Sequence, residues 1–321
     1  MNPPVSVVCT VKNEGDNILN LLESLKNQTR KPDEVIIVDG GSTDNTPSII
    51  KEFSQNNQIF KLIIKEGSNI AQGRNLAIKS SRNELMAVTD AGCLPKEDWL
   101  ENLLKEMNED TDVVSGFYLP DMRSKFEEMV ANLTYPKLEL IDEKNFLPSS
   151  RSVCFRKKCW EEIGGYPEES LTAEDTFFDI KLKEKNFKFR FAKDAIVYWR
   201  CRKNFKQLFK QWYGYAKGDG ILGLIKKEGY GKKHYRKIIL EGYGFTLSIF
   251  LGISISFLIP LIFATLGLGY FYLIFLRKTL KIKQKTFSME DNLRGILILM
   301  TIHVGQFFGI HIGYIKHKSL H

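Results

Sequence analysis

Two groups of acidic residues have the types and spacing needed to bind a nucleotide and to move a proton. Asp39-Gly40-Gly41-Ser42 directly follows the apolar run 35–38. A carboxylate at the end of a buried strand suits the base or ribose hydroxyls of a nucleotide, and glycines let the backbone turn close to that ligand. In the second group, Glu174-Asp175, a carboxylate at a helix N-terminus can accept the proton of an attacking hydroxyl group. Both patterns also have structural interpretations, as a strand-to-helix turn and as an acidic first helical turn.

Alternating strand and helix patterns would position these residues. In chain order the patterns are strand 5–10, helix 18–25, strand 35–38, helix 46–53, strand 61–64, helix 70–78 and strand 85–89. Later segments suggest helices at 124–131, 157–163 and 174–185 and short strands near 153 and 195–198. The alternation predicts an α/β domain with a mostly parallel sheet, helices on both faces and ligands at the carboxyl ends of the strands.

Composition limits the classes of protein that fit. The 321 residues are 43% hydrophobic and carry a net charge of +8, which favours anionic partners such as phosphates or acidic lipids. Five cysteines without a CxxC pair are expected to be reduced thiols rather than a zinc site. The start of the chain lacks the charged and apolar regions of a signal peptide, so we expect the first domain to stay in the cytoplasm.

The last third of the chain has the composition of a membrane segment. Residues 245–276 contain no charge over 32 positions and have basic flanks, which predicts a membrane hairpin that turns near Pro260 with both ends in the cytoplasm. A third segment, 295–315, is apolar but contains polar residues and either spans the membrane or lies at its surface. We therefore expect a cytoplasmic catalytic domain, 1–240, and membrane-associated helices, 241–321, at the inner cell membrane. Core helices of a soluble domain are the disfavoured alternative.

A basic amphipathic helix precedes this region. One helical stripe between residues 203 and 220 consists of Phe205, Leu208, Phe209, Trp212 and Ala216. The stripe either lies on a membrane surface or packs against the catalytic domain.

The opening of the chain resembles a known family. The stretch VSVVCTVKNEGDNILNLLESLKNQTRKPDEVIIVDGGSTDNT is similar to the start of the family-two inverting glycosyltransferases, which have the GT-A nucleotide-sugar-binding fold. The resemblance continues in order over about residues 5–220, through Arg74-Asn75, TDAGC at 89–93, PSSRSVCFRKKCWEEIGGYPE at 148–168, AEDTFFD at 173–179 and YAKGDG at 215–220.

The resemblance implies which residues bind the donor. They are Thr10, Glu14, Asp39, Ser42, Arg74, Asp90 and Gly92. Thr10 and Glu14 would border the nucleobase and Asp39 would contact its ring. Arg74 would support the base or the diphosphate, and Asp90 would hold ribose or a metal-linked diphosphate. Helix capping by Glu14 and a solvated surface charge at Arg74 are the alternatives.

The resemblance also implies the catalytic groups. Asp175 would be the general base of an inverting transfer, and Glu174 would orient the acceptor or that base. The residues expected near the diphosphate or the acceptor are Ser150, Arg151, Gly165, Arg200 and Arg202. The alternative for Gly165 is structural: the glycine pair at 164–165 would simply end a helix.

The expected metal site departs from the family pattern. A divalent cation, Mg²⁺ or Mn²⁺, is implied, but the usual Asp-x-Asp reads Asp90-Ala91-Gly92. Asp90 would then be the single carboxylate ligand, with phosphate and water completing the coordination. Arg200 or Arg202 would partly compensate as diphosphate clamps.

These features together predict a membrane-anchored glycosyltransferase. Its partners would be a nucleoside-diphosphate sugar, a lipid-linked or glycan acceptor and the membrane, whereas the acidic site residues argue against nucleic acid. A polyprenyl-phosphate sugar synthase and a non-catalytic sugar-nucleotide-binding membrane protein are the alternatives. A dinucleotide-dependent oxidoreductase is disfavoured because the first strand is not followed by G-x-G-x-x-G.

Overall fold

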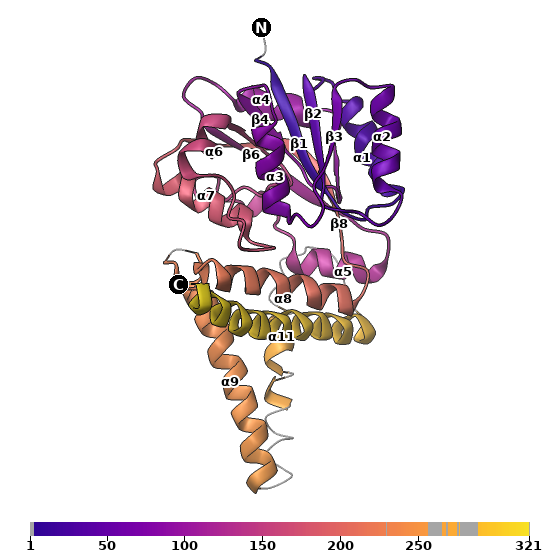
Figure 1. Cartoon of the computed structure of the whole chain (residues 1–321). Coiled ribbons are helices and arrows are strands. Elements are labelled where there is room, and N and C mark those ends of the chain that lie inside the picture. The colour runs from indigo at the N-terminus through magenta and orange to yellow at the C-terminus, as the bar shows by residue number, and fades with distance from the viewer. Residues whose placement is uncertain are drawn as a thin grey trace. The chain divides into compact units, whose positions relative to one another are not determined.

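The chain forms two compact units. The computed structural model describes residues 3–228, 230–255, 265–267, 269–274, 276 and 288–320 (Figure 1). The first unit comprises Met1–Asp121 and Pro136–Arg200, and the second comprises Met122–Tyr135 and Cys201–His321. The domain boundary expected at residue 240 stays a prediction.

One mixed sheet organises the first unit. Its strands are β1 (Val5–Val11), β2 (Glu34–Asp39), β3 (Phe60–Ile64), β4 (Leu85–Val88), β5 (Cys93–Pro95), β6 (Val113–Asp121), β7 (Val153–Arg156) and β8 (Phe189–Arg200). Their order is β3-β2-β1-β4-β7-β6-β8-β5. The strands β3, β2, β1 and β4 are parallel, and β6 is parallel to β8. The strand β7 runs antiparallel to both neighbours, and β5 runs antiparallel to β8. The mostly parallel sheet is thus confirmed, with antiparallel strands added where the chain continues beyond β4.

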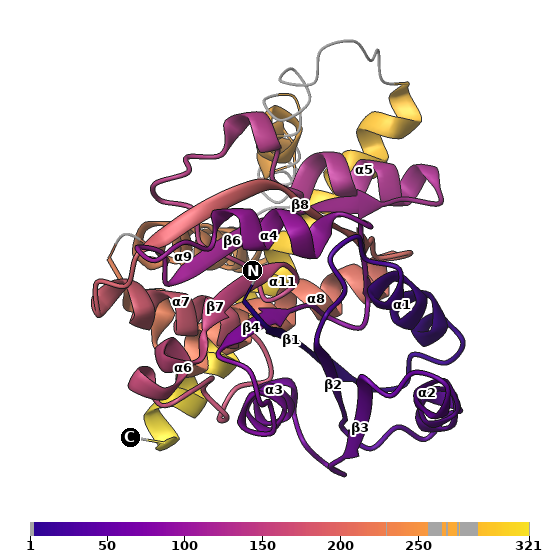
Figure 2. The same cartoon turned by 90° about the horizontal axis from the view of Figure 1, so that it is seen from above.

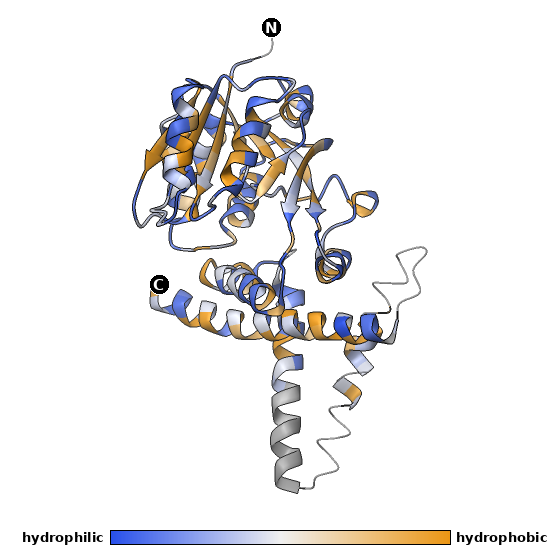
Figure 3. Ribbon diagram, turned by 90° about the vertical axis from the view of Figure 1, so that its right-hand side faces the viewer, coloured by the Kyte–Doolittle hydropathy of each residue, from blue (hydrophilic) through white to orange (hydrophobic). Residues whose placement is uncertain are grey.

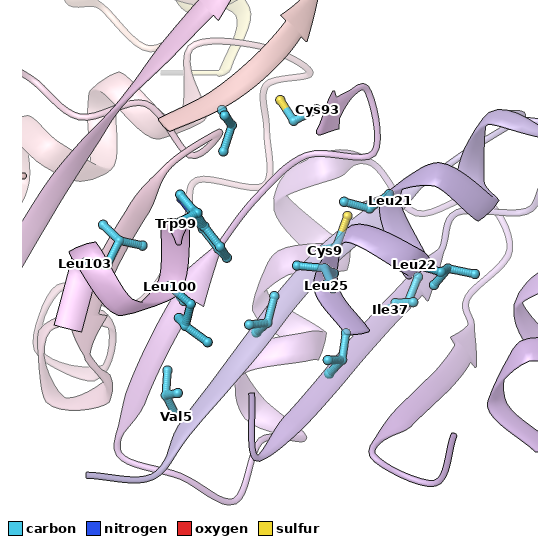
Figure 4. Close-up of a cluster of buried hydrophobic side chains, with 14 of the residues drawn as sticks. Val5, Cys9, Leu21, Leu22, Leu25, Ile37, Cys93, Trp99, Leu100 and Leu103 are labelled. Atoms are coloured by element: carbon cyan, nitrogen blue, oxygen red, sulfur yellow. The ribbon is translucent and has the colours of Figure 1, made fainter. Parts of the chain in front are cut away.

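Helices cover both faces of this sheet (Figure 2). They are α1 (Asn17–Lys26), α2 (Thr46–Gln55), α3 (Ile70–Lys79), α4 (Trp99–Glu106), α6 (Lys157–Ile163) and α7 (Glu174–Glu184), with a short 3-10 turn at Leu138–Leu140. Successive side chains of a strand point to opposite faces. Val5 and Cys9 of β1 accordingly lie in the core beneath α1 and α4 (Figure 4), whereas Val8 lies in the core beneath α3, α6 and α7.

The apolar patterns located most of these elements, but α4, β5 and β6 were missed. In β6 the cause is Gly116 and Pro120, residue types that usually interrupt a strand. A Cβ atom on Gly116 would lie 2.0 Å from Oγ of Ser152, so the close pairing of β6 with β7 requires glycine.

The second unit is helical. It contains α5 (Lys125–Thr134), α8 (Phe205–Ile221), a 3-10 turn at Leu224–Lys226, α9 (Lys232–Ile255) and α11 (Met289–Leu320). Leu208 of α8 is fully buried in a cluster with Met129 of α5 and Ile298 of α11. Ala216 of α8 is equally buried beside Ile310 of α11. The buried part of the amphipathic stripe is therefore an internal packing surface, so of the two alternatives the structure supports packing against protein for these residues.

The expectation of several membrane helices needs correction. Among the described residues one helix, Glu290–Leu320, is long and apolar enough to cross a membrane, and a shorter apolar helix covers 265–274. The helix Glu290–Leu320 contains the predicted third segment, 295–315. The predicted hairpin 245–276 coincides with the end of α9 and the shorter helix, but its turn at Pro260 lies outside the described residues.

Candidate active site

The turn after β2 leaves one buried carboxylate oxygen available. Asp39 is fully buried, and its Oδ1 accepts hydrogen bonds from the backbone N–H groups of Gly41 (2.8 Å) and Ser42 (2.7 Å). Its Oδ2 is buried and has no hydrogen-bond partner among the described residues. An unsatisfied buried polar atom costs free energy. The hydrogen bonds of the turn account for the burial of Oδ1 but not for that of Oδ2. The other oxygen can accept a hydrogen bond from a ligand.

The loops after β1 and β2 are hydrogen-bonded to each other. The backbone N–H of Asn13 donates to Oγ of Ser42 (2.8 Å), and the backbone N–H of Glu14 donates to Oγ1 of Thr46 (3.0 Å). Thr10 pairs with Val38 at the ends of these strands. The structure thus brings Thr10, Glu14, Asp39 and Ser42 to one edge of the sheet, as the sequence predicted. The sequence analysis did not identify Asn13 as a residue of this loop. Its φ of 55° lies in the left-handed region, which asparagine tolerates better than most residues.

Arg74 of α3 links two separate parts of the site. It is 1% exposed, and its Nη1 and Nη2 atoms lie 2.5 Å from Oε1 of Glu174 and 2.5 Å from Oδ1 of Asp90. The alternative of a solvated surface charge is therefore wrong. Both Nη atoms bind carboxylates of the protein, so Arg74 fixes the end of β4 relative to the start of α7.

Glu174 is a buried acid with an unusual proton affinity. Burial raises its pKa from 4.5 to about 7; Arg74 opposes this shift, and the charge of Asp175 adds to it. A carboxyl group in this environment exchanges its proton near neutral pH, and such groups gather at functional sites.

Asp175 is held by donors from two elements. Its Oδ1 accepts from the backbone N–H of Thr176 (2.8 Å). Its Oδ2 accepts from Oγ of Ser149 (3.3 Å) and from the backbone N–H of Ser150 (3.4 Å). Three donors therefore orient the carboxylate at the start of α7, where the sequence placed the base.

A stacked arginine extends this network. Nη1 of Arg151 donates to Oγ of Ser149 (2.5 Å), and the guanidinium carbon lies 3.8 Å from the ring centroid of Trp199. Arg151 thereby supports Asp175 through Ser149. The sequence resemblance had placed Ser149 at the site together with Ser150 and Arg151, whereas it gave Trp199 no role.

The backbone conformation and close packing at Gly165 require a glycine. Its φ is 86°, and a Cβ atom there would lie 2.8 Å from Oδ1 of Asn75. That oxygen accepts hydrogen bonds from Trp160 and from the backbone of Tyr166. The hydroxyl of Tyr166 in turn contacts Oγ of Ser150 at 3.0 Å. Gly165 thus lets the chain approach α3 closely, whereas Gly164 ends α6 in the left-handed conformation.

The region around Asp90 bears on the expected cation. One oxygen of Asp90 is bound by Arg74, and the side chain is 21% exposed. A Cβ atom on Gly92 would meet no atom within 4 Å, so the place of the missing second carboxylate is open. No group of three or more His, Cys, Asp or Glu side chains that could hold a metal occurs among the described residues. Asp90 fits a cation only as one ligand, with the remaining oxygens supplied by substrate and water.

The two expected clamp arginines lie in different units. The backbone N–H of Arg200 donates to the carbonyl of Gly92 (3.4 Å), and its Nε lies 4.0 Å from Oδ2 of Asp121. Arg200 is thus at the same sheet edge as Gly92. Arg202 belongs to the second unit, and its contact with a diphosphate stays a prediction.

One buried acid of the site was not predicted. Asp179 lies one helical turn after Asp175 and is 3% exposed, and its Oδ2 has no hydrogen-bond partner among the described residues. Burial, and then the charge of Asp175, raise its pKa well above the usual range. In the sequence, the spacing of four residues from Asp175 indicates that both side chains lie on the same face of the helix.

Known proteins resemble this chain along most of its length. A family model for glycosyl transferase family group 2 matches residues 88–277, and one for glycosyl transferase family 2 matches residues 6–160. Glycosyltransferase AglE of Haloferax volcanii is 28% identical over 226 residues, 68% of this chain and 73% of that protein. O-antigen chain rhamnosyltransferase RfbN of Salmonella typhimurium is 26% identical over 206 residues, 60% of this chain and 65% of that protein. The chain thus spans slightly less than two thirds of the Salmonella protein.

A solved structure shares the fold. A mannosyltransferase of Pyrobaculum calidifontis, determined in complex with GDP-Man and Mn²⁺, superposes with a TM-score of 0.59 at 16% identity, covering 94% of this chain and 87% of that one. The chain belongs to glycosyltransferase family 2 and has a GT-A-like fold. It is therefore an enzyme that transfers a sugar from a nucleotide sugar.

Proposed function

We propose that this enzyme is an inverting glycosyltransferase that acts on a membrane-associated acceptor, with Asp175 as the general base. The observation that carries the proposal is the fixed position of Asp175, which receives hydrogen bonds from Ser149, Ser150 and Thr176. A base held in one orientation avoids reorganisation when the proton moves.

The reaction then proceeds as one displacement. Asp175 takes the proton of an acceptor hydroxyl while that oxygen bonds to the anomeric carbon of the donor. The bond from this carbon to the diphosphate breaks on the opposite face, and its electron pair leaves with the nucleoside diphosphate. Configuration is inverted because attack and departure take place on opposite faces.

Donor binding is assigned to the sheet edge at β1 and β2. The unpartnered Oδ2 of Asp39 suits an N–H donor of a uracil or guanine ring, whereas a phosphate would be repelled by it. Glu14, Ser42 and Thr10 border the same edge. Arg74 serves this site by positioning Asp90 and Glu174, to which both of its Nη atoms are bound.

The diphosphate is assigned to the region of Asp90, Gly92, Arg151 and Arg200. A divalent cation, Mg²⁺ or Mn²⁺, would be held by Asp90 and would stabilise the negative charge of the leaving diphosphate. Arg200 lies at the same sheet edge and can bind diphosphate oxygens directly. The mannosyltransferase of Pyrobaculum calidifontis was determined in complex with Mn²⁺, which supports the presence of such an ion here.

The acceptor is assigned to the membrane because α11 is apolar and because the chain carries a net charge of +8. A glycan on a polyprenyl carrier fits, and so does the phosphate of the carrier itself. The named relative of Salmonella, an O-antigen chain rhamnosyltransferase, favours the glycan.

Nucleoside-diphosphate release by the detergent-solubilised full chain tests this function. A panel of UDP-, GDP- and dTDP-sugars is offered with and without membrane lipid extract, and with Mn²⁺, Mg²⁺ or a chelator. We expect release from one donor that depends on the extract and falls in chelator. Release that is independent of the extract would contradict the membrane acceptor.

A further inference from the structure

The C-terminal half of α11 is paired with α8. Glycines on α11 recur every fourth residue, and each approaches the backbone of α8: Cβ atoms would lie 3.1 Å from the carbonyl oxygen of Phe209 at Gly305, 2.4 Å from that of Tyr213 at Gly309, and 2.3 Å from that of Lys217 at Gly313. One turn later, Nδ1 of His317 lies 2.8 Å from the carbonyl oxygen of Ile221. The two helices therefore run in the same direction in close contact.

Another face of α11, about 100° around the helix from these glycines, is apolar and exposed. Its residues are Leu293, Leu297, Val304, Phe308, Ile312 and Ile315. Steps of three, four and seven residues place them on one stripe about 33 Å long. We call this set the α11 stripe; Figure 3 shows the apolar course of the helix between hydrophilic ends.

The pairing with α8 limits how α11 can meet a bilayer. If α11 crossed the hydrocarbon, α8 would cross with it. The helix α8 carries the exposed side chains of Lys206 and Lys210. A lysine at the centre of a spanning helix is costly, and the apolar residues Leu208 and Ala216 of α8 are already packed inside the unit, so they cannot face lipid to offset this cost. A spanning α11 is therefore disfavoured, although its length and composition alone permit it.

The contacts with α9 place α11 at the polar half of that helix. Gln306 lies 3.3 Å from His234, His303 lies 3.9 Å from Glu241, and His311 lies 2.8 Å from the hydroxyl of Tyr243. His234 and Glu241 precede the charge-free part of α9, residues 242–255, and Tyr243 lies at its start. In Figure 1, α9 crosses α11 and leaves it on the side away from α8.

We propose that α11 lies in the plane of the membrane surface, with the α11 stripe facing the acyl chains and α8 on the aqueous side. The charge-free half of α9 then enters the hydrocarbon. The exposed cations nearby complement anionic lipid headgroups: Lys203, Lys206, Lys210, Lys226, Lys232, Lys233 and Arg236. This proposal rests on the membrane association proposed above and adds the orientation of the helix.

Depth measurements on the full chain in vesicles of phosphatidylcholine and phosphatidylglycerol test the orientation. Leu293→Cys, Val304→Cys and Ile315→Cys each receive an environment-sensitive fluorophore, which lipids with quenchers at shallow or deep acyl positions then quench. All five native cysteines are buried, so labelling under native conditions falls on the introduced residue; unlabelled wild-type protein checks this. Lys210→Cys on α8 is the matched control and should be quenched by aqueous iodide.

An in-plane helix predicts similar shallow depths, about 5–10 Å below the headgroups, at all three stripe positions. A spanning helix would instead place Val304 about 16 Å deeper than both ends, which would overturn the orientation but leave membrane association intact. Absence of lipid quenching at every position would overturn both, whereas donor-dependent nucleotide release would still report the transferase separately.

Discussion

At the scale of residues, one buried arginine joins two acids of the site that are far apart in the sequence. Arg74 is bound to Asp90 and Glu174, which are 16 and 100 residues away in the sequence. The pattern around each residue predicted a role in donor binding or catalysis, but it could not predict that one arginine joins the two carboxylates. Such a contact depends on how β4, α3 and α7 meet in space, and local periodicity does not encode that meeting.

The pKa of Glu174 gives protein stability a pH dependence with a definite sign. Burial raises this pKa from 4.5 in the unfolded chain to about 7, so between these values the folded state holds a proton that the unfolded state has lost. The free energy of unfolding should therefore fall as pH rises through this window, by up to about 1.4 kcal/mol per pH unit from this group. Urea unfolding across the window measures the slope.

The variant Glu174→Gln is the test of that assignment. Its amide cannot ionise, so the slope should be shallower than in the wild type by the contribution of Glu174. Asp179→Asn is a useful companion, because the raised pKa of Asp179 acts in the same direction. An unchanged slope in Glu174→Gln would show that Glu174 is ionised in the folded protein throughout the window.

At the scale of elements, regular periodicity made the first half of the fold predictable. The strands and helices from β1 to β4 follow apolar runs that alternate with amphipathic segments, and the structure confirms them. The strand β6 was missed because Gly116 and Pro120 interrupt its pattern. The amphipathic stripe of α8 was recognised, but its partners in α5 and α11 follow only from long-range packing.

The pairing of α8 and α11 predicts a sharp difference between two faces of one helix. Gly309→Leu should destabilise the second unit by about 1–3 kcal/mol, because the new side chain would meet the backbone at Tyr213. Val304→Leu, on the exposed α11 stripe, is the matched control and should change stability by less than about 0.5 kcal/mol. Chemical unfolding and limited proteolysis of the solubilised protein measure both. Equal stabilities would contradict the close approach of the two helices.

At the scale of the whole molecule, the chain combines an α/β unit with a helical unit for which we propose a place at the membrane surface. Glycosyltransferase family 2 membership accounts for the first. For the second, hydropathy predicted apolar segments, but it could not decide between spanning and surface helices. That choice depends on the neighbours of α11, and the lysines of α8 favour the surface.

Replacement of Asp175 by asparagine tests the central claim most directly. The turnover number and the affinity for the donor are measured side by side for the wild type, Asp175→Asn and Asp110→Asn, the last being a control whose side chain is 87% exposed. Loss of the general base should lower turnover by about 10²–10⁴-fold while donor affinity stays unchanged, and the control should match the wild type. Undiminished turnover, or a loss of donor affinity equal to the loss of activity, would contradict the assignment of Asp175 as the base.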